Sequence, residues 1–376
     1  MSVEFLTLNE FKQDIIEGTR DYIKVYKSSN IDEITEYIYN LLNIIYDKHF
    51  HKYIYKEIIQ QIICEYFPSV NNSKFLFKLT EGSVEKCKNR VNELLSKPQP
   101  EQRSEEWYNK RFNSIGASEL ASIFNKSPFC TYAKYLEKKL KPPDNTPQPF
   151  NIYCHHGVKY EPIAQQLYCL ENKKEIIEFG SINHETIEYI SASPDGITKD
   201  GIMLEIKCPF KREITGIPPI YYWYQMQQQL EVCKLNRCDF LECKITEYQN
   251  WKEFESDTSC IKKSCIVEFS ENNKLDYIYP KEFLQDKELI IDWLQKVKHT
   301  IGKDKNKEYI RIILWKLEYY SCIPIYRNKK WWKENVSKIN EFWNTVLEKR
   351  KTYVATPEIK SLKKKGPIEY LFLDDP

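Results

Sequence analysis

The chain has 376 residues, of which 41% are hydrophobic and 29% are charged, so it is long enough for one large domain or two to three ordinary domains. Its 56 Lys and Arg residues nearly balance its 54 Asp and Glu residues, which excludes a protein dominated by a polybasic or polyacidic tail. No run of about eighteen apolar residues occurs, so the sequence predicts no membrane span. The first residues lack a secretory signal pattern, and an intracellular protein is therefore expected.

Helical patterns fill the first hundred residues. The three-four spacing of one helical face is followed by apolar residues at Ile31, Ile34, Ile38, Leu41, Leu42 and Ile45. Similar patterns recur until about residue 95. The proline-containing segment 97–102 then interrupts the pattern and is typical of a linker. Residues 1–98 are therefore predicted to form a helical N-terminal extension.

The middle of the chain alternates between two periods. Short segments rich in β-branched and aromatic residues predict strands, and helical patterns lie between them. The predicted strands cover 176–182, 187–192, 202–207, 240–245 and 265–269, and the predicted helices cover 118–124, 161–170 and 222–233. Residues 103–280 are therefore predicted to form an α/β core.

Charge is unevenly distributed along the chain. Residues 281–376 contain 21 basic and 14 acidic residues, which gives this part a net charge of +7. Apolar spacing predicts helices at 283–297 and 332–346, so the region is interpreted as a basic helical C-terminal region. A basic part is compatible with a phosphate-backbone partner, although charge alone favours an ordinary solvated helical surface.

The strongest chemical signal combines Ser193-Pro194-Asp195-Gly196 with Leu204-Glu205-Ile206-Lys207. Strand alternation places Glu205 and Lys207 on one face and Ile206 on the other. A turn signal at 199–201 predicts a hairpin that brings Asp195 close to Glu205. Two carboxylates with a nearby backbone carbonyl are suitable oxygen ligands for Mg²⁺, and the lysine can position a water or stabilise a charged transition state. Taken alone, the pattern also fits a surface hairpin with an ion pair.

Weaker signals lie on either side of this hairpin. Glu161 precedes Pro162 at an expected helix start, where it is either a third carboxylate of the site or an acid that interacts with the helix dipole. Ser118 is expected to cap a helix whose free amides, together with Arg111, bind a phosphate, and a plain cap with a surface arginine is the alternative. Gln225 shares a helical face with Gln229, where amides can hold a water or a phosphate.

The ordered set of motifs resembles one family. The motifs are Arg103-x-x-x-Trp107-x-x-x-Arg111 with Gly116-Ala117-Ser118-Glu119, His156-Gly157-x-x-x-Glu161-Pro162, Ser193-Pro194-Asp195-Gly196, Glu205-Ile206-Lys207-Cys208-Pro209 and Tyr222-x-x-Gln225-x-Gln227. Together they resemble the YqaJ-type viral recombinases, which include the phage lambda exonuclease and belong to the PD-(D/E)xK nuclease superfamily. The resemblance covers residues 103–245 and implies a restriction-endonuclease-like α/β core, a central mixed sheet flanked by helices, in a protein of a large DNA virus.

The resemblance also implies roles for individual residues. Asp195, Glu205, the Ile206 carbonyl and Glu161 match metal ligands, for two Mg²⁺ ions or for Mn²⁺ in their place. Lys207 and Gln225 match catalytic residues, in addition to the acids. Arg111, Ser118 and Ser193 match residues that engage the DNA 5′-phosphate or lie near the active site.

The implied activity is Mg²⁺-dependent 5′→3′ digestion of linear double-stranded DNA in viral recombination, repair or replication. Two alternatives stay open: a PD-(D/E)xK endonuclease of the resolvase or restriction type, and a non-catalytic DNA-binding protein. The implied partners are duplex DNA ends, a single-strand annealing protein and further copies of the chain, as a trimer by resemblance only. The implied location is the host cytoplasm or a viral factory, with the nucleus as an alternative.

Overall fold

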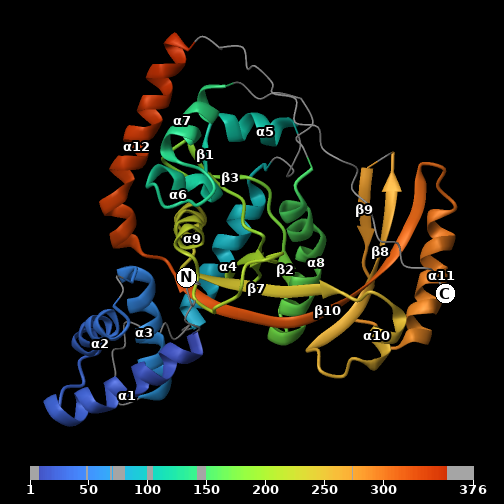
Figure 1. The fold of residues 1–376 in the computed structure, drawn as a ribbon. Coiled ribbons are helices and arrows are strands. Elements are labelled where there is room, and N and C mark those ends of the chain that lie inside the picture. Colours follow the sequence, from blue (N-terminus) through green and yellow to red (C-terminus); the bar gives the residue numbers. More distant parts are fainter. Residues whose placement is uncertain are drawn as a thin grey trace.

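The computed structural model describes residues 8–47, 50–67, 70, 81–99, 105–141, 150–272 and 274–353. They form a mixed α/β structure in which a large sheet is flanked by helices (Figure 1). The predicted α/β class, with a central mixed sheet between helices, is confirmed. No helix among these residues combines the length and the apolar character that crossing a membrane requires.

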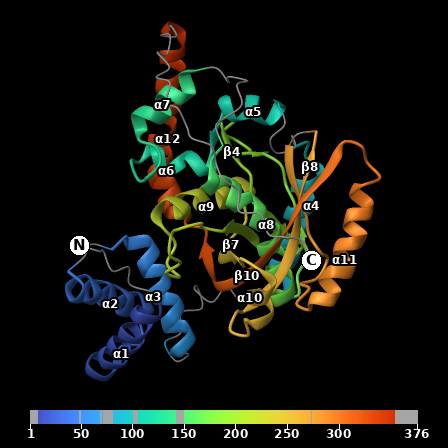
Figure 2. The same cartoon turned by 45° about the vertical axis from the view of Figure 1, so that its right-hand side comes forward.

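Among the described residues, four helices precede the core, as the spacing of apolar residues predicts. They are α1 (Leu8–Tyr26), α2 (Ile31–Ile45), α3 (Lys52–Tyr66) and α4 (Glu81–Ser96). The Asn30 side chain caps α2 by accepting from the Asp32 amide. Ile31, Ile34 and Ile38 of the predicted stripe are buried, whereas Ile45 at the end of the helix is exposed. Helices α1 to α3 pack together to one side of the sheet (Figures 1 and 2).

The main sheet has seven strands in the order β2-β5-β6-β7-β10-β8-β9. Its strands are β2 (Ile176–Ile177), β5 (Gly196–Thr198), β6 (Met203–Lys207), β7 (Arg237–Glu247), β8 (Lys262–Glu271), β9 (Lys274–Ile278) and β10 (Lys307–Tyr326). Only β6 and β7 pair in parallel, and the other neighbours are antiparallel. A smaller sheet contains β1 (Ile115–Gly116), β4 (Ile190–Ala192) and β3 (Ile182–Asn183).

Two long helices cover the two faces of the main sheet. Helix α8 (Ile152–Asn172) buries Ile163 and Leu167 against β6 and β7, together with Leu204 and Leu241. Helix α9 (Ile220–Cys233) belongs to the core on the other face, which includes Phe240. Phe240 and Leu241 are adjacent on β7, so strand alternation points their side chains to opposite faces of the sheet, and each belongs to a different core. The site described below lies on β6, between these two helices.

The remaining elements extend this core at both ends of the sheet. They are α5 (Glu105–Phe112), the 3₁₀ turn η1 (Ala117–Glu119), α6 (Leu120–Ile123), α7 (Tyr132–Leu140), α10 (Trp251–Ser256), α11 (Lys287–Ile301) and α12 (Lys329–Thr352). Helix α11 packs on β8 and β10, whereas α12 runs along α6, α7 and α9 (Figure 1).

The C-terminal region differs from the expectation that it is helical. Helices α11 and α12 are present, but residues 307–326 form β10, which lies inside the sheet between β7 and β8. Its pairing partners β7 and β8 lie well before it in the chain, so no local pattern indicates the pairing. The sheet therefore continues past residue 280, and residues 354–376 of the predicted C-terminal region lie outside the described part of the chain.

Two predicted helix starts are also wrong. Helix α8 begins at Ile152, where Asn151 caps it, so Glu161 and Pro162 lie in its middle instead of its first turn. Ser118 is not a helix cap, because it lies within η1, which begins after Gly116. The helix start is marked by the Asn151 side chain, which accepts from the Tyr153 and Cys154 amides.

Candidate active site

Two carboxylates and an ammonium group meet at the β5–β6 hairpin. The antiparallel register that pairs Gly196 with Leu204 brings Asp195 next to the following residue of β6. That residue is Glu205, and Lys207 lies two positions further on the same face. The Lys207 ammonium donates to Glu205 Oε1 and lies 3.9 Å from Asp195 Oδ2. The hairpin predicted from the sequence is therefore present, and it brings these three side chains together.

The Lys207 ammonium lies among three oxygen atoms. It contacts Glu205 Oε1, it donates to the Ile206 carbonyl at 2.9 Å, and Asp195 Oδ2 lies nearby. These are the oxygen atoms that the family resemblance assigns to a metal ion. Because they converge on one position that a positive charge occupies, the donor set fits a hard divalent cation.

Glu205 is held from the opposite side by helix α9. Its side chain is 0% exposed, and each carboxylate oxygen accepts a hydrogen bond from a glutamine. Gln225 Nε2 donates to Oε1 at 2.7 Å, and Gln229 Nε2 donates to Oε2 at 2.6 Å. The two glutamines lie four residues apart on one helical face, so the helix positions both amides at once. Gln229 also lies 3.3 Å from the carbonyl of Ser193, which ties the segment before Asp195 to the same helix.

The sequence indicates only that Gln229 shares a helical face with Gln225, whereas in the structure its amide binds the buried Glu205 carboxylate. We expect Gln229→Met to lower the free energy of unfolding by about 1–3 kcal/mol, because the buried Glu205 oxygen loses its donor. Urea denaturation measures this change. Gln13 provides the control, since its amide donates to exposed Glu17 on α1 and Gln13→Met should change stability by less than about 0.5 kcal/mol. Equal losses in the two variants would contradict the proposed importance of the Gln229 contact.

Asp195 lies in a strongly negative environment. Its side chain is 19% exposed, and its Oδ2 accepts from the Ile206 amide at 2.6 Å. Burial, followed by the Glu205 carboxylate, raises the pKa of Asp195 well above its ordinary value, and the Glu161 carboxylate of α8 acts in the same direction. The Lys207 ammonium opposes this effect. The Glu161 carboxylate therefore acts electrostatically on Asp195, and its role as a metal ligand stays a prediction.

The ammonium at the centre of the site is strongly stabilised as a cation. Burial alone would lower the pKa of Lys207, but Glu205 and Asp195 raise it above its ordinary value. Lys207 Nζ also lies 5.2 Å from the centroid of the Tyr222 ring on α9. Lys207 therefore carries a positive charge at neutral pH, directly beside both carboxylates.

The described residues contain no group of three His, Cys, Asp or Glu side chains that could hold a metal ion by themselves. Asp195, Glu205 and the Ile206 carbonyl would leave the other coordination positions to water, which is the arrangement that Mg²⁺ favours. These residues fit one hydrated ion. A second ion, with Glu161 as its ligand, stays a prediction.

Two of the predicted phosphate-binding residues, Arg111 and Ser118, lie on α5 and η1, close to Glu119. Arg111 lies near the end of α5, and Ser118 is exposed in η1. Arg111 NH2 lies 3.5 Å from Glu119 Oε1, and Lys139 also pairs with Glu119. Burial would raise the pKa of Glu119, but Lys139, Arg111 and Lys138 hold it at about 2. One carboxylate thus faces three cations, an arrangement that is compatible with an anion nearby.

Helix α9 connects the segment that leads to Glu119 with the segment that carries Asp195. Gln228, next to Gln229, is fully buried and donates to the Ile115 carbonyl at 2.8 Å and to the Ser191 carbonyl at 2.9 Å. Ile115 begins the strand that leads into η1, and Ser191 belongs to the strand before Asp195. Gln228 and Gln229 of α9 therefore hold the segment before η1 and the β5–β6 hairpin in a fixed relative position.

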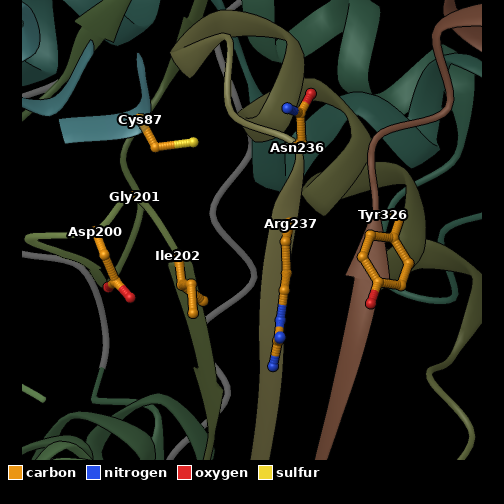
Figure 3. A pocket seen from close by; sticks show the side chains of 7 residues that line it. All are labelled: Cys87, Asp200, Gly201, Ile202, Asn236, Arg237 and Tyr326. Atoms are coloured by element: carbon orange, nitrogen blue, oxygen red, sulfur yellow. The ribbon is translucent and has the colours of Figure 1, made fainter. Parts of the chain in front are cut away.

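A small cavity lies at the other end of β6. It is lined by Cys87 of α4, the hairpin turn, Arg237 and Tyr326 (Figure 3). The cavity has a volume of about 30 Å³, which is enough for a single water molecule and too little for a nucleotide. Arg237 is already paired with Asp239, at 2.6 Å. This cavity is therefore part of the packing of α4 against the sheet.

Residues 106–249 match the YqaJ-like viral recombinase domain. "Uncharacterized protein R354" of Acanthamoeba polyphaga mimivirus is 32% identical to the chain in an alignment 301 positions long, which covers 69% of this chain and 54% of that protein. A protein of African swine fever virus (isolate Tick/Malawi/Lil 20-1/1983) is 27% identical in an alignment 174 positions long, which covers 36% of this chain and 47% of that protein. The chain spans about half the length of these curated relatives. The resemblance that the motifs indicate, including the similarity to proteins of large DNA viruses, is confirmed.

Two solved structures are also similar to the chain. The crystal structure of an alkaline exonuclease (LHK-Exo) from Laribacter hongkongensis has a TM-score of 0.42 and 21% identity, covering 66% of this chain and 95% of that chain. The crystal structure of a phage-related exonuclease from Haemophilus somnus 129PT has a TM-score of 0.34 and 12% identity, covering 64% of this chain and 94% of that chain.

Proposed function

We propose that this chain, whose residues 106–249 match the YqaJ-like viral recombinase domain, is a Mg²⁺-dependent nuclease that digests linear duplex DNA in the 5′→3′ direction. The observation that carries the proposal is the convergence of Asp195, Glu205 and the Ile206 carbonyl on a single cationic position. The family match supports the nucleic-acid substrate, and the geometry of the hairpin supports hydrolysis.

Each side chain of the hairpin would have a distinct task. Asp195, Glu205 and the Ile206 carbonyl would hold the ion, and the amides of Gln225 and Gln229 keep the Glu205 carboxylate in a fixed orientation. A bound Mg²⁺ would polarise the phosphodiester and lower the pKa of its bound water.

The Lys207 ammonium would leave the carboxylates when the ion binds. It would then orient the attacking water and stabilise the negative charge that develops on the phosphate. Because the side chain is 22% exposed and its amine is at the end of a flexible stem, this shift requires no movement of the sheet.

Arg111 and Ser118 would bind the 5′-phosphate at the end of the duplex, with Ser193 close to the reacting strand. The three cations that surround Glu119 support this assignment, since a terminal phosphate carries more charge than an internal one. We expect Arg111→Ala to raise KM for 5′-phosphorylated ends by about 10-fold or more and to change KM for 5′-hydroxyl ends much less. Initial rates on two duplexes that differ only in this group measure the effect. An equal change for both ends would refute the assignment.

The proposed activity is tested by a time course with Mg²⁺ on linear duplexes labelled at either the 5′ or the 3′ end, with closed circular DNA as the control. Early release of the 5′ label, with the circle left intact, is the expected result. Cleavage of the circle would indicate an endonuclease, and binding of either DNA without digestion would indicate a non-catalytic DNA-binding protein.

The wider setting is part of the same proposal. Relatives in large DNA viruses support a role in viral DNA recombination or repair inside the infected cell, in the cytoplasm, a viral factory or the nucleus. The 3′-ended single strand that such digestion leaves is the substrate for an annealing protein. Assembly into a trimer rests on the family resemblance alone.

A further inference from the structure

Helix α8 carries Glu161 and contains a proline in its middle. Pro162 has no amide hydrogen, so the carbonyl four residues earlier loses its helical donor. The turns after Pro162 are fixed by the core, where Ile163 and Leu167 are buried. A helix interrupted by proline can bend at that point, and of the turns before Pro162 the core cluster holds the fully buried Tyr160 ring. Glu161 lies at the end of that first half.

Buried polar contacts hold the first half of α8 against the sheet. The Lys159 ammonium and the Tyr160 hydroxyl both bind Glu247 Oε1, the hydroxyl at 2.8 Å. The Tyr279 hydroxyl donates to the backbone carbonyl of Lys159 at 2.8 Å. Glu247 ends β7, and Tyr279 follows β9. The two residues immediately before Glu161 are therefore bound to the sheet by polar groups.

A second layer of contacts supports these groups. His155 Nε2 lies 2.6 Å from the Tyr277 hydroxyl, which donates to Glu268 at 2.9 Å. Arg311 of β10 donates to Glu268 at 2.6 Å and lies 4.0 Å from Glu247. The support thus comes from β8, β9 and β10, which follow the matched domain in the chain.

The charges in this cluster balance. Two cations, Lys159 and Arg311, face two carboxylates, Glu247 and Glu268. The side chains of Lys159 and Glu268 are only 8% and 7% exposed. Buried ion pairs of this kind seldom contribute much net stability, because desolvation offsets their attraction. Their geometric effect is stronger, since each charge must stay next to its partner.

We propose that the Lys159–Glu247 pair is a positioning device that fixes the turn of α8 carrying Glu161 and so sets the affinity of the site for its metal ion. This inference rests on the proposed function, because it takes Glu161 as a group of the metal site. The pair itself lies inside the matched domain, on α8 and β7, and it is supported from outside that domain by Tyr279, which follows β9, and by Arg311 of β10.

The test removes both charges of the pair together. In Lys159→Met/Glu247→Gln no buried charge loses its partner within the pair. We expect the dissociation constant for Mn²⁺, measured by calorimetry on the full chain without DNA, to rise about 10-fold or more. The turnover number at saturating Mg²⁺ should change far less than the Mg²⁺ concentration needed for half-maximal activity.

Two further variants complete the design. Lys316 lies on β10, the strand that carries Arg311, and pairs with Asp257. Lys316→Met should leave Mn²⁺ affinity unchanged. Tyr160→Phe removes one hydrogen bond to Glu247 and should weaken Mn²⁺ binding in the same direction, which keeps the test decisive if the double variant does not fold.

Unchanged Mn²⁺ affinity in the folded double variant would overturn the proposal, and so would unchanged affinity in Tyr160→Phe. An equal loss in Lys316→Met would do the same, because the effect would then be general. A wild-type chain that binds Mn²⁺ but digests no DNA would refute the proposed function, whereas the comparison of affinities would still decide this inference.

Discussion

Lys207→Ala is expected to lower the turnover number on linear duplex DNA by about 10²–10³-fold, because a fixed positive charge next to the reacting phosphate is lost. The same change should not weaken Mg²⁺ binding. In the structure the Lys207 ammonium contacts Glu205 Oε1 and the Ile206 carbonyl, so it competes with a cation for those oxygens. A Mg²⁺ titration of the initial rate measures both quantities, and the half-maximal concentration should stay equal or fall.

Lys199→Ala is the matched control for this prediction. Lys199 lies near the turn of the same hairpin, and its side chain is 68% exposed where it pairs with Glu175. Its removal should leave the turnover number unchanged. A variant at Lys207 that keeps wild-type turnover, or one that loses activity only through weaker metal binding, would contradict the role assigned to the ammonium.

Asp195→Asn is expected to abolish measurable digestion and also to stabilise the fold at neutral pH. The loss of a charged ligand removes an interaction worth several kcal/mol in the transition state, which corresponds to about 10³-fold or more in rate. The gain in stability follows from electrostatics. Burial and Glu205 raise the pKa of Asp195 in the folded protein, so the charged form opposes folding above the pKa of the unfolded chain.

The sign of the stability effect depends on pH. A raised pKa contributes stability that is present at low pH and is lost as the pH rises through the folded-state value. The difference in midpoint temperature between Asp195→Asn and wild type should therefore grow from about pH 4 towards pH 7. Thermal unfolding at several pH values without divalent metal measures it.

Asp200→Asn provides the opposite case on the same hairpin. Burial would raise the pKa of Asp200, but Lys174 and Thr198 hold it below its ordinary value, so its charged form supports folding. This variant should lose a little stability at neutral pH and retain activity. If Asp195→Asn is also destabilised at neutral pH, the account of the carboxylate pair is wrong.

The hairpin could be predicted from sequence because all of its determinants are local. A turn signal at 199–201 joins two short strands, and alternation alone places Glu205 and Lys207 on one face. Gly201 has a φ of +82°, which a glycine adopts without strain. The contribution of Gln229 was visible only as a shared helical face with Gln225. Its contact with Glu205 requires the packing of α9 on the sheet.

The features that were mispredicted depend on distant contacts. Strand β10 pairs with β7 and β8, which are distant in the sequence. The residues near β10 therefore do not indicate which strands it pairs with or in which register. Pro162 is tolerated inside α8 because Tyr279 and Glu247 hold the preceding residues, whereas a local rule places proline in a first turn. Such compensation is tertiary and leaves no signal near the proline itself.

The central claim is that a divalent cation binds where the Lys207 ammonium now lies. The most direct test is anomalous diffraction from crystals soaked in Mn²⁺. The account predicts a peak within coordination distance of the Asp195 and Glu205 carboxylates and the Ile206 carbonyl, with the ammonium displaced. Ordered crystals with no peak at this position, or with a peak bound only elsewhere, would contradict it.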